Sequence, residues 1–304
     1  MEDLDTYLLK FKGYYFDRPV LDMSILENLE DFEIRDDDVF LITYPKSGTI
    51  WTQQILSLIY YEDHRNNTSQ KPTLDLIPFL EYNLHNVDFI NSPSPRLFTS
   101  HLPYYLVPNG LKKKKAKIIY VYRNPKDVMN SYFHFSKFVS VLEPIKDIEE
   151  FMKRFLDGKV VGSLWFDHVR DWYKNKHHFN ILFMMYEDMT KDLRSAVLKI
   201  CRFLEKELSD VEVDVIVKQL KELKNKLKPR VTRLKDALGK VQNDPGSIKR
   251  RRKVSPLQPS PQAAPQPVLS TTLGLWCSGG REQRQAACGQ WPEGRGGGDS
   301  ARSC

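Results

Sequence analysis

Short apolar runs alternate with segments of helical hydrophobic spacing along the first 220 residues. The apolar runs predict buried strands at 39–44, 96–100, 117–122 and 180–186. Apolar residues at helical spacing predict helices at 51–59, from about Lys126, at 160–172 and at 193–204. This alternation is typical of a parallel sheet whose connecting helices cover it. The predicted fold class is therefore α/β, with a parallel β-sheet flanked by helices.

The last third of the chain differs from this body in charge and composition. Residues 221–253 carry 13 Lys and Arg against 3 Asp and Glu, whereas the whole chain has a net charge of +7. Residues 254–304 contain 8 Gly, 6 Pro, 6 Ser and 6 Gln, so they bury too little apolar surface to offset the entropy of ordering. We predict a domain at 1–220, a basic helical extension at 221–253 that Pro229 interrupts, and a disordered tail at 254–304.

The sequence argues against several classes of protein. It contains no stretch of about 18 apolar residues, so we predict no membrane span. Its acidic start is not followed by the apolar region of a secretory signal. Only Cys201 of the 4 cysteines precedes the tail, which favours a reducing, cytoplasmic setting. The basic run at 249–253 is more typical of a solvated segment than of a nucleic-acid or nuclear-targeting signal.

The loop between the first predicted strand and helix, TYPKSGT at 43–49, has the character of an anion site. A helix that begins beyond the carboxyl end of a strand presents free N–H groups and the positive end of its dipole. Gly48 permits close approach of the backbone, and Ser47 and Thr49 offer hydroxyls. Lys46 can neutralise a phosphate, although the spacing is not that of a Walker A motif. An ordinary strand-to-helix turn is the alternative.

Two other predicted strands are followed by residues that could bind an anion or transfer a proton. Arg123 follows the strand at 117–122, where it and Ser131 could clamp one phosphate; a surface ion pair at a helix start is the alternative. His101 follows the strand at 96–100 and could act as a general base, although a lone histidine is more often structural. Three predicted strands thus lead to Lys46, His101 and Arg123, which we expect on one rim of the sheet.

Four blocks, in order, resemble the signature blocks of the cytosolic sulfotransferases: TYPKSGTIW at 43–51, His101-Leu102-Pro103, RNPKDVMNSYFHF at 123–135 and Tyr186-Glu187-Asp188-Met189. The resemblance covers about residues 8–220. The stretch FKGYYF at 11–16, with Thr99-Ser100, is most similar to the amine sulfotransferase branch. The resemblance implies a P-loop-like sulfotransferase fold, with the C-terminal part truncated or replaced. It also implies that PAPS (3′-phosphoadenosine-5′-phosphosulfate) is the sulfonate donor.

The resemblance implies roles for individual residues. His101 would take the proton of the acceptor, and Lys46 would stabilise the leaving phosphate oxygen. The implied donor-binding residues are Lys46, Ser47, Gly48, Thr49, Ile50, Trp51, Arg123, Ser131 and Tyr186. The implied acceptor-lining residues are Phe16, Phe79 and Phe135, each of which is alternatively a core residue only. The resemblance implies no metal, and it implies a small amine or phenol as acceptor, as in xenobiotic metabolism.

The sequence departs from the family pattern after Leu220. Family members continue with a donor-contacting Thr-Ser-Phe-like segment, an Arg-Lys-Gly loop around the 3′-phosphate and a C-terminal dimer motif, and this sequence has none of them. Many members also have lysine where this chain has Thr99. Two lost charge-assisted contacts would cost about 3–6 kcal/mol, or about 10²- to 10⁴-fold in donor affinity.

The predicted function is therefore PAPS-dependent sulfonate transfer to an amine or hydroxyl of a small acceptor, with weak or absent activity in this chain. The alternative is a catalytically impaired isoform or interaction protein that retains a partial sulfotransferase fold. A P-loop nucleotide kinase is disfavoured, since the sequence has neither Walker A spacing nor an evident magnesium carboxylate.

Overall fold

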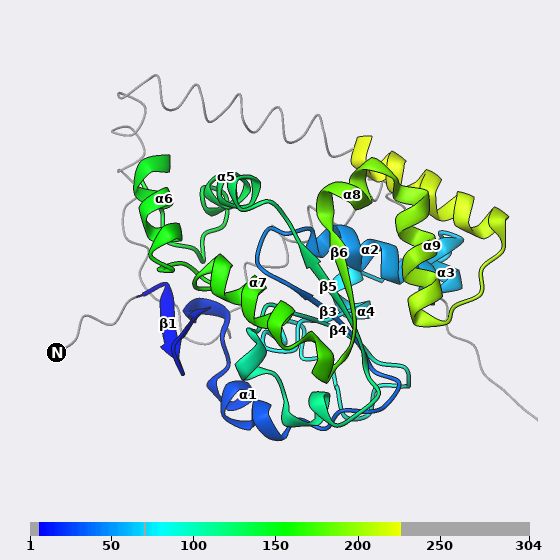
Figure 1. Ribbon diagram of the computed structural model, residues 1–304, viewed down its shortest axis with the longest axis horizontal. Coiled ribbons are helices and arrows are strands. Elements are labelled where there is room, and N and C mark those ends of the chain that lie inside the picture. The colour runs from blue at the N-terminus through cyan, green and yellow to red at the C-terminus, as the bar shows by residue number, and fades with distance from the viewer. Residues whose placement is uncertain (1–5, 70, 226–304) are drawn as a thin grey trace, which may run out of the picture.

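A four-stranded parallel sheet forms the centre of the computed structural model, which describes residues 6–69 and 71–225 (Figure 1). The strands are β3 (Val39–Thr43), β4 (Leu97–Ser100), β5 (Lys117–Tyr122) and β6 (Asn180–Met185). Their order across the sheet is β4-β3-β5-β6, and all three pairings are parallel. The predicted α/β fold with a parallel sheet is confirmed, and each predicted strand lies within one residue of its observed bounds.

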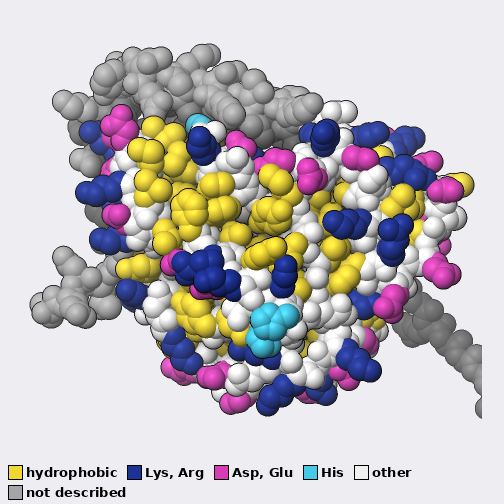
Figure 2. All heavy atoms as spheres, viewed as in Figure 1, with side chains coloured by type: hydrophobic (Ala, Val, Ile, Leu, Met, Phe, Trp, Pro, Cys, Tyr) yellow, Lys and Arg dark blue, Asp and Glu magenta, His cyan; other side chains and the backbone are white. Residues whose placement is uncertain are grey.

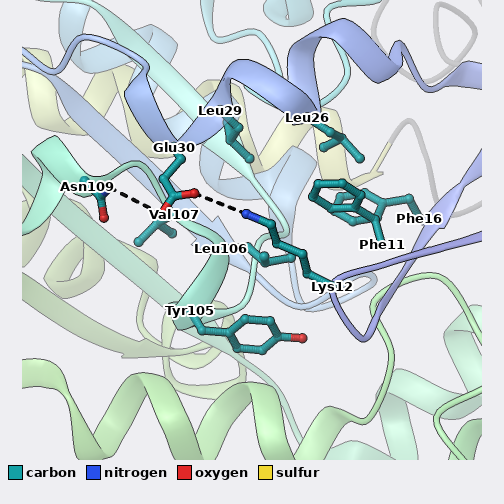
Figure 3. A pocket seen from close by; sticks show the side chains of 10 residues that line it. All are labelled: Phe11, Lys12, Phe16, Leu26, Leu29, Glu30, Tyr105, Leu106, Val107 and Asn109. Carbon is teal, nitrogen blue, oxygen red and sulfur yellow. Dashed lines mark hydrogen bonds and ion pairs between the residues drawn. The ribbon is translucent and has the colours of Figure 1, made fainter.

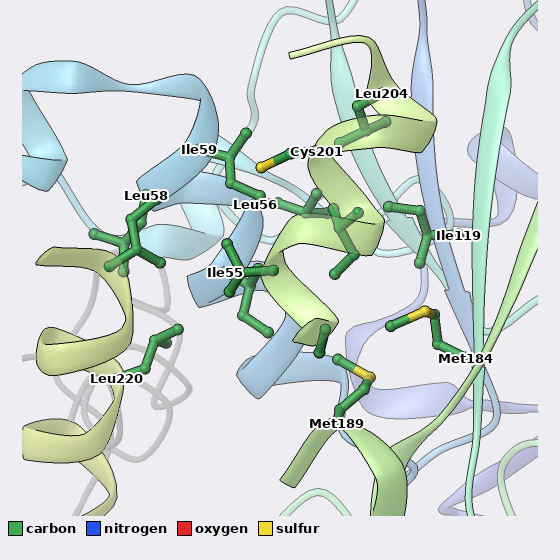
Figure 4. Close-up of a cluster of buried hydrophobic side chains, with 14 of the residues drawn as sticks. Ile55, Leu56, Leu58, Ile59, Ile119, Met184, Met189, Cys201, Leu204 and Leu220 are labelled. Carbon is green, nitrogen blue, oxygen red and sulfur yellow. The ribbon is translucent and has the colours of Figure 1, made fainter. Parts of the chain in front are cut away.

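Alternate residues of the central strands pack on opposite faces of the sheet. Leu41 and Ile119 face a cluster formed with α2 (Thr49–Tyr60), α9 (Leu193–Leu204) and the helix at 210–225 (Figure 4). Phe40 and Tyr120 face a second cluster, to which α1 (Met23–Asn28) and α7 (Trp165–Lys174) contribute. Both faces are therefore covered, which explains why the strands appear in the sequence as continuous apolar runs.

The other elements surround this core. An antiparallel hairpin is formed by β1 (Leu8–Phe11) and β2 (Tyr14–Asp17). The remaining α-helices are α3 (Glu62–Arg65), α4 (Thr73–Leu76), α5 (Pro125–Ser136), α6 (Ile148–Leu156) and α8 (Tyr186–Lys191). Short 3₁₀ turns occur at Arg18–Val20, Leu29–Asp31, Tyr104–Leu106, Asn109–Lys112 and Lys176–His178. A third apolar cluster fixes α5 and α6 beside the sheet.

The helix predicted at 160–172 begins later than expected, at Trp165. Gly162 and Ser163 have φ values of 98° and 56°, in the left-handed region that α-helical residues do not adopt. The N–H of Gly162 donates to the carbonyl of Tyr15, 3.0 Å away, so this segment is a turn against the hairpin. The prediction was wrong over 160–164 because apolar spacing carries no information on the sign of φ.

The helix at 210–225 crosses the predicted domain boundary at 220/221 without interruption. Val213, Ile216 and Leu220 on this helix are buried in the cluster with α2 and α9 (Figure 4). The rest of the predicted basic extension, the interruption at Pro229 and the predicted tail at 254–304 lie outside the described residues.

The surface mixes charges around an apolar area. Figure 2 shows hydrophobic side chains gathered over α5, α6 and α7, with basic and acidic side chains interspersed around them. On α6 and α7, the side chains of Met152, Leu156 and Phe166 are 43%, 55% and 51% exposed. Within residues 6–69 and 71–225, none of the helices has the length and apolarity that a membrane crossing requires.

A buried ion pair joins the residues that precede β3 and β4. Nε and Nη2 of Arg96 donate to the two carboxylate oxygens of Asp38 at 2.8 and 2.6 Å. The two side chains are 2% and 0% exposed. Nη1 of Arg96 donates to the carbonyl of Phe89, and Nη2 also donates to the carbonyl of Glu33. Arg96 thus ties two loops to the sheet.

We predict that Asp38→Ala lowers the free energy of unfolding by about 3–5 kcal/mol, because the substitution leaves a buried guanidinium without its counter-charge. Urea unfolding measures this loss. Glu30→Ala is the matched control, since it removes the exposed ion pair of Glu30 with Lys12 and should cause no resolvable change. Equal effects of the two substitutions would contradict the assignment.

Candidate active site

Loops that follow four neighbouring strands meet at one edge of the sheet. In the order of the strands, β4 leads to His101, β3 to Lys46, β5 to Arg123 and β6 to Tyr186. The carboxyl ends of parallel strands share an edge, so residues far apart in the chain lie side by side there. The lysine, histidine and arginine singled out in the sequence therefore lie on one rim.

The loop before α2 leaves several hydrogen-bond donors unsatisfied. Lys46 and Gly48 have φ values of 68° and 104°, which turn the chain sharply into the helix. The first N–H groups of a helix have no partner within the helix, and no capping side chain accepts from those of α2. The hydroxyl of Ser47 is buried without a hydrogen bond. Unsatisfied donors at the positive end of a helix dipole form a site suited to an anion.

Two cations lie at this loop: Lys46 within it and Arg123 beside it. Nζ of Lys46 lies 3.6 Å from the centroid of the Phe135 ring. The guanidinium of Arg123 lies 4.6 Å from the centroid of the Tyr186 ring and donates to the carbonyl of Lys46 at 3.2 Å. Within the described residues, neither cation forms an ion pair with a carboxylate. Burial, and secondly the charge of Arg123, lower the pKa of Lys46 to about 7.

The contacts of His101 define its tautomer. Its Nδ1 lies 2.7 Å from the carbonyl oxygen of Thr43, and because a carbonyl only accepts, Nδ1 carries the proton. Nε2 therefore carries the lone pair. Burial lowers the pKa of His101 to about 4; the Thr43 carbonyl opposes this shift, and the charge of Lys46 adds to it. The imidazole is neutral at pH 7 and is electrostatically coupled to Lys46.

The other residues implied in donor binding lie near this loop or on neighbouring helices. Trp51 is half-buried in the first turn of α2 and packs, like Tyr186, against the α2–α9 cluster; its Nε1 is buried without a partner. Ile50 is half-buried in the same turn. Ser131 is half-buried in the second turn of α5, the helix into which Arg123 leads.

The three aromatic residues implied in acceptor binding occupy different positions. The ring centroid of Phe79 lies 5.1 Å from that of His101. Phe135 lies under the lysine ammonium described above. Phe16 is fully buried, and the ring of Tyr82 links it to Phe79, with centroid separations of 6.4 and 6.3 Å. Phe79 and Phe135 therefore lie at the rim, and Phe16 lies in the core behind it.

Phe16 also lines a cavity of about 40 Å³ beside the hairpin, shown in Figure 3. Phe11, Leu26 and Leu29 contribute apolar walls, and the ion pair of Lys12 with Glu30 crosses the cavity. This volume holds a few water molecules, whereas a benzene ring needs about 150 Å³. The cavity is too small for a ring-sized acceptor, and none of Lys46, His101 and Arg123 lines it.

Sequence reasoning missed a carboxyl group beside the histidine. Glu81 is 1% exposed, and its Oε1 accepts the N–H of His101 at 2.6 Å. Burial raises the pKa of Glu81 to about 7, although hydrogen bonds from His101 and Ser100 oppose the shift. Its Oε2 is buried without a partner. A single glutamate in a loop carries no sequence signal, and only its burial beside His101 distinguishes it.

No cluster of metal ligands accompanies these groups. Across residues 6–69 and 71–225, the structure contains no group of three or more His, Cys, Asp or Glu side chains placed to hold a metal ion. The rim thus presents an uncapped helix N-terminus, two cations without a counter-charge and a neutral histidine, an arrangement that suits an anionic ligand beside a proton acceptor.

Comparison with known proteins assigns this arrangement to a family. The sulfotransferase domain model matches residues 36–254. The rabbit (Oryctolagus cuniculus) amine sulfotransferase is 68% identical over 219 residues, which cover 72% of this chain and 73% of the relative. The guinea pig (Cavia porcellus) 3-beta-hydroxysteroid sulfotransferase is 37% identical over 211 residues, which cover 69% of this chain and 74% of the relative. The chain belongs to the sulfotransferase family and is a sulfotransferase enzyme.

Solved structures agree with this assignment. The crystal structure of mouse sulfotransferase SULT7A1 complexed with PAP superposes with a TM-score of 0.63 at 33% identity, covering 70% of this chain and 74% of the mouse chain. Retinol dehydratase in complex with androsterone and PAP superposes with a TM-score of 0.59 at 25% identity, covering 69% of this chain and 71% of that protein.

We predict that Gly48→Ala weakens the binding of an anionic ligand at this loop at least tenfold. A Cβ there would lie 2.4 Å from Cδ2 of Tyr186, so the ring beneath Arg123 must move. Calorimetric titration with PAP measures this effect. The matched control is Gly13→Ala, which has a similar φ of 86° but places its Cβ no closer than 3.8 Å to Oη of Tyr105.

Both glycine substitutions force alanine into the left-handed region, and each should therefore cost about 1–2 kcal/mol of stability. Only Gly48→Ala should also weaken the binding of the anionic probe. Equal affinity for PAP in the two variants would contradict an anion site at this loop.

Proposed function

We propose that this chain transfers the sulfonate group of PAPS to an amine or hydroxyl group of a small acceptor. The observation that carries the proposal is the content of one rim of the sheet. This rim holds unsatisfied N–H and hydroxyl donors, the cations Lys46 and Arg123, and the neutral His101. The PAP complex of a solved relative supports the choice of donor.

The donor would lie across the carboxyl ends of β3, β5 and β6. Lys46 and the turn formed by Ser47, Gly48, Thr49 and Ile50 would bind the 5′-phosphosulfate, because the helix N–H groups and the ammonium are free to receive it. The rings of Trp51 and Tyr186 would contact the adenine. Arg123, whose Nε is buried without a partner, would bind the 3′-phosphate with Ser131.

The reaction needs one proton transfer. The acceptor nitrogen or oxygen attacks sulfur as the bond between sulfur and the 5′-phosphate oxygen breaks. The electron pair of that bond stays on the phosphate oxygen, where Lys46 stabilises the charge. The acceptor proton moves to Nε2 of His101, and the products are the sulfonated acceptor and PAP. The negative charges of the donor would raise the pKa of His101 from about 4 and so strengthen it as a base.

The proposed acceptor and cellular setting rest on the relatives, the aromatic residues at the rim and the state of the cysteine. The likeness to the rabbit amine sulfotransferase favours an amine, with a phenol as the second acceptor class. Phe79 and Phe135 would contact its apolar part at the rim, with Phe16 behind them. Cys201 is a buried free thiol, which fits the reducing environment of the cytoplasm.

We predict that Lys46→Ala lowers the rate of transfer of radiolabelled sulfonate to an aromatic amine at least 10³-fold, since it removes the charge at the leaving oxygen. Lys137→Ala is the control: Nζ of Lys137 also lies over an aromatic ring, 4.6 Å from the centroid of Phe133, but it donates to the carbonyl of Lys146. Unchanged transfer by Lys46→Ala would contradict the proposal.

Binding of PAP should also take up about one proton at pH 8. Free Lys46 has a pKa of about 7 and is mostly neutral at pH 8, and a bound phosphate restores its charge. Calorimetric titration in two buffers of different ionisation enthalpy counts the protons. Lys46→Arg keeps the cation charged at every pH, so its proton uptake should fall close to zero. Equal uptake by both proteins would contradict the role of Lys46.

The second candidate is a donor-impaired sulfotransferase that acts as an interaction protein. The sequence favours it because the Arg-Lys-Gly loop of the family is missing, which leaves Arg123 and Ser131 as the proposed 3′-phosphate ligands. The family's dimer motif is also absent, so we do not propose the family dimer. Calorimetric titration with PAP separates the candidates: micromolar or tighter binding supports the enzyme and overturns the impaired form.

A further inference from the structure

We propose that His168 is a positioning residue that holds the main chain of His101 and thereby orients its imidazole. The inference rests on the proposed role of His101 as the proton acceptor. His168 lies on α7, 67 positions away in the chain, and is 2% exposed. No step of the transfer described above uses it, yet it is buried directly behind the rim.

A chain of hydrogen bonds defines what His168 does. Its Nε2 lies 3.0 Å from the carbonyl oxygen of His101, so Nε2 must carry the proton. Its Nδ1 therefore accepts, and the hydroxyl of Tyr120 donates to it at 2.8 Å. Tyr120 lies on β5, so this bond ties the His168 ring to the sheet. The hydroxyl of Tyr14 donates to the same His101 carbonyl at 2.5 Å.

The remaining polar atoms of His101 are held from other directions. The carboxyl of Glu81 accepts its backbone N–H, and the Thr43 carbonyl accepts its Nδ1–H. Every polar atom of His101 except Nε2 is thus engaged with the protein. A residue restrained at both ends of its main chain and at one ring nitrogen presents its free nitrogen in a fixed direction, which is what a proton acceptor beside an in-line reaction requires.

The residue one turn after His168 provides a natural comparison. Nε1 of Trp172, on the same face of α7, donates to the carbonyl of Leu102 at 3.1 Å. The helix therefore holds two successive carbonyls of the loop after β4. The two bonds are of the same type and equally buried, but only the one from His168 reaches the proposed proton acceptor.

The test uses the full chain, labelled with ¹⁵N at histidine, and the signals of His101 are identified by their absence from His101→Gln. In the wild type, His101 should show only the tautomer protonated at Nδ1. His168→Phe keeps a ring in place but removes the donor, so the second tautomer of His101 should appear. The kcat for sulfonate transfer should fall about 10- to 100-fold, while PAP affinity stays within about twofold.

Two further variants separate positioning from general damage. The amide of His168→Gln can donate to the same carbonyl and should restore kcat to within about fivefold of the wild type. Trp172→Phe loses the neighbouring bond and should keep both the His101 tautomer and kcat. Tyr120→Phe removes the bond that ties the His168 ring to β5 and should cause an intermediate loss of kcat. This variant serves as the test if His168→Phe does not fold.

The outcomes distinguish this inference from the proposed function. An unchanged His101 tautomer in His168→Phe, or equal losses of kcat in His168→Phe and Trp172→Phe, would overturn the positioning role. If the wild type transfers no sulfonate but the tautomer of His101 still responds to His168→Phe, the positioning role is supported and the proposed function fails. Failure of His168→Gln to recover either the tautomer or kcat would also overturn the positioning role.

Discussion

Parallel pairing of β3 with both β4 and β5 is the constraint on which the rest of this structure depends. Because β3 lies between its two partners and all five of its residues are buried, its carboxyl end is fixed relative to theirs. The loops that carry Lys46, His101 and Arg123 start at these ends, so their starting points are fixed relative to one another. The buried Asp38–Arg96 pair holds the amino ends of β3 and β4 together. The geometry of the rim is therefore set by the sheet and not by the loops alone.

The rim carries an electrostatic cost that a bound anion would relieve. Lys46 and Arg123 repel each other, and burial already lowers the pKa of Lys46 to about 7. The nearby Ser47 hydroxyl and Arg123 Nε are buried without partners. An isolated protein gains no stability from such an arrangement. It fits a site that is completed by an anionic substrate. Burial, and secondly the charge of Lys46, lower the pKa of His101 in the free protein.

The sequence predicted the elements whose signal is local, and it missed those defined by packing. The four strands were predictable because both faces of the sheet are covered, which makes each strand a continuous apolar run. The helix at 160–172 was predicted too long because Gly162 and Ser163 adopt positive φ within an apolar pattern. Glu81 could not be predicted as part of the site, since its role follows from a hydrogen bond to a residue 20 positions away. An anion site at the loop of 43–49 was predictable from the residues, whereas the assignment of residues to particular parts of the donor came from the family resemblance.

The central claim is that Lys46, His101 and the anionic donor share one electrostatic site. The most direct test is the pKa of the His101 imidazole, measured by NMR with and without saturating PAP. The account predicts a pKa near 4 in the free protein and a rise of at least about one unit when PAP binds, because the phosphates offset the charge of Lys46. A pKa of His101 that does not move on PAP binding, while PAP remains bound, would contradict the account.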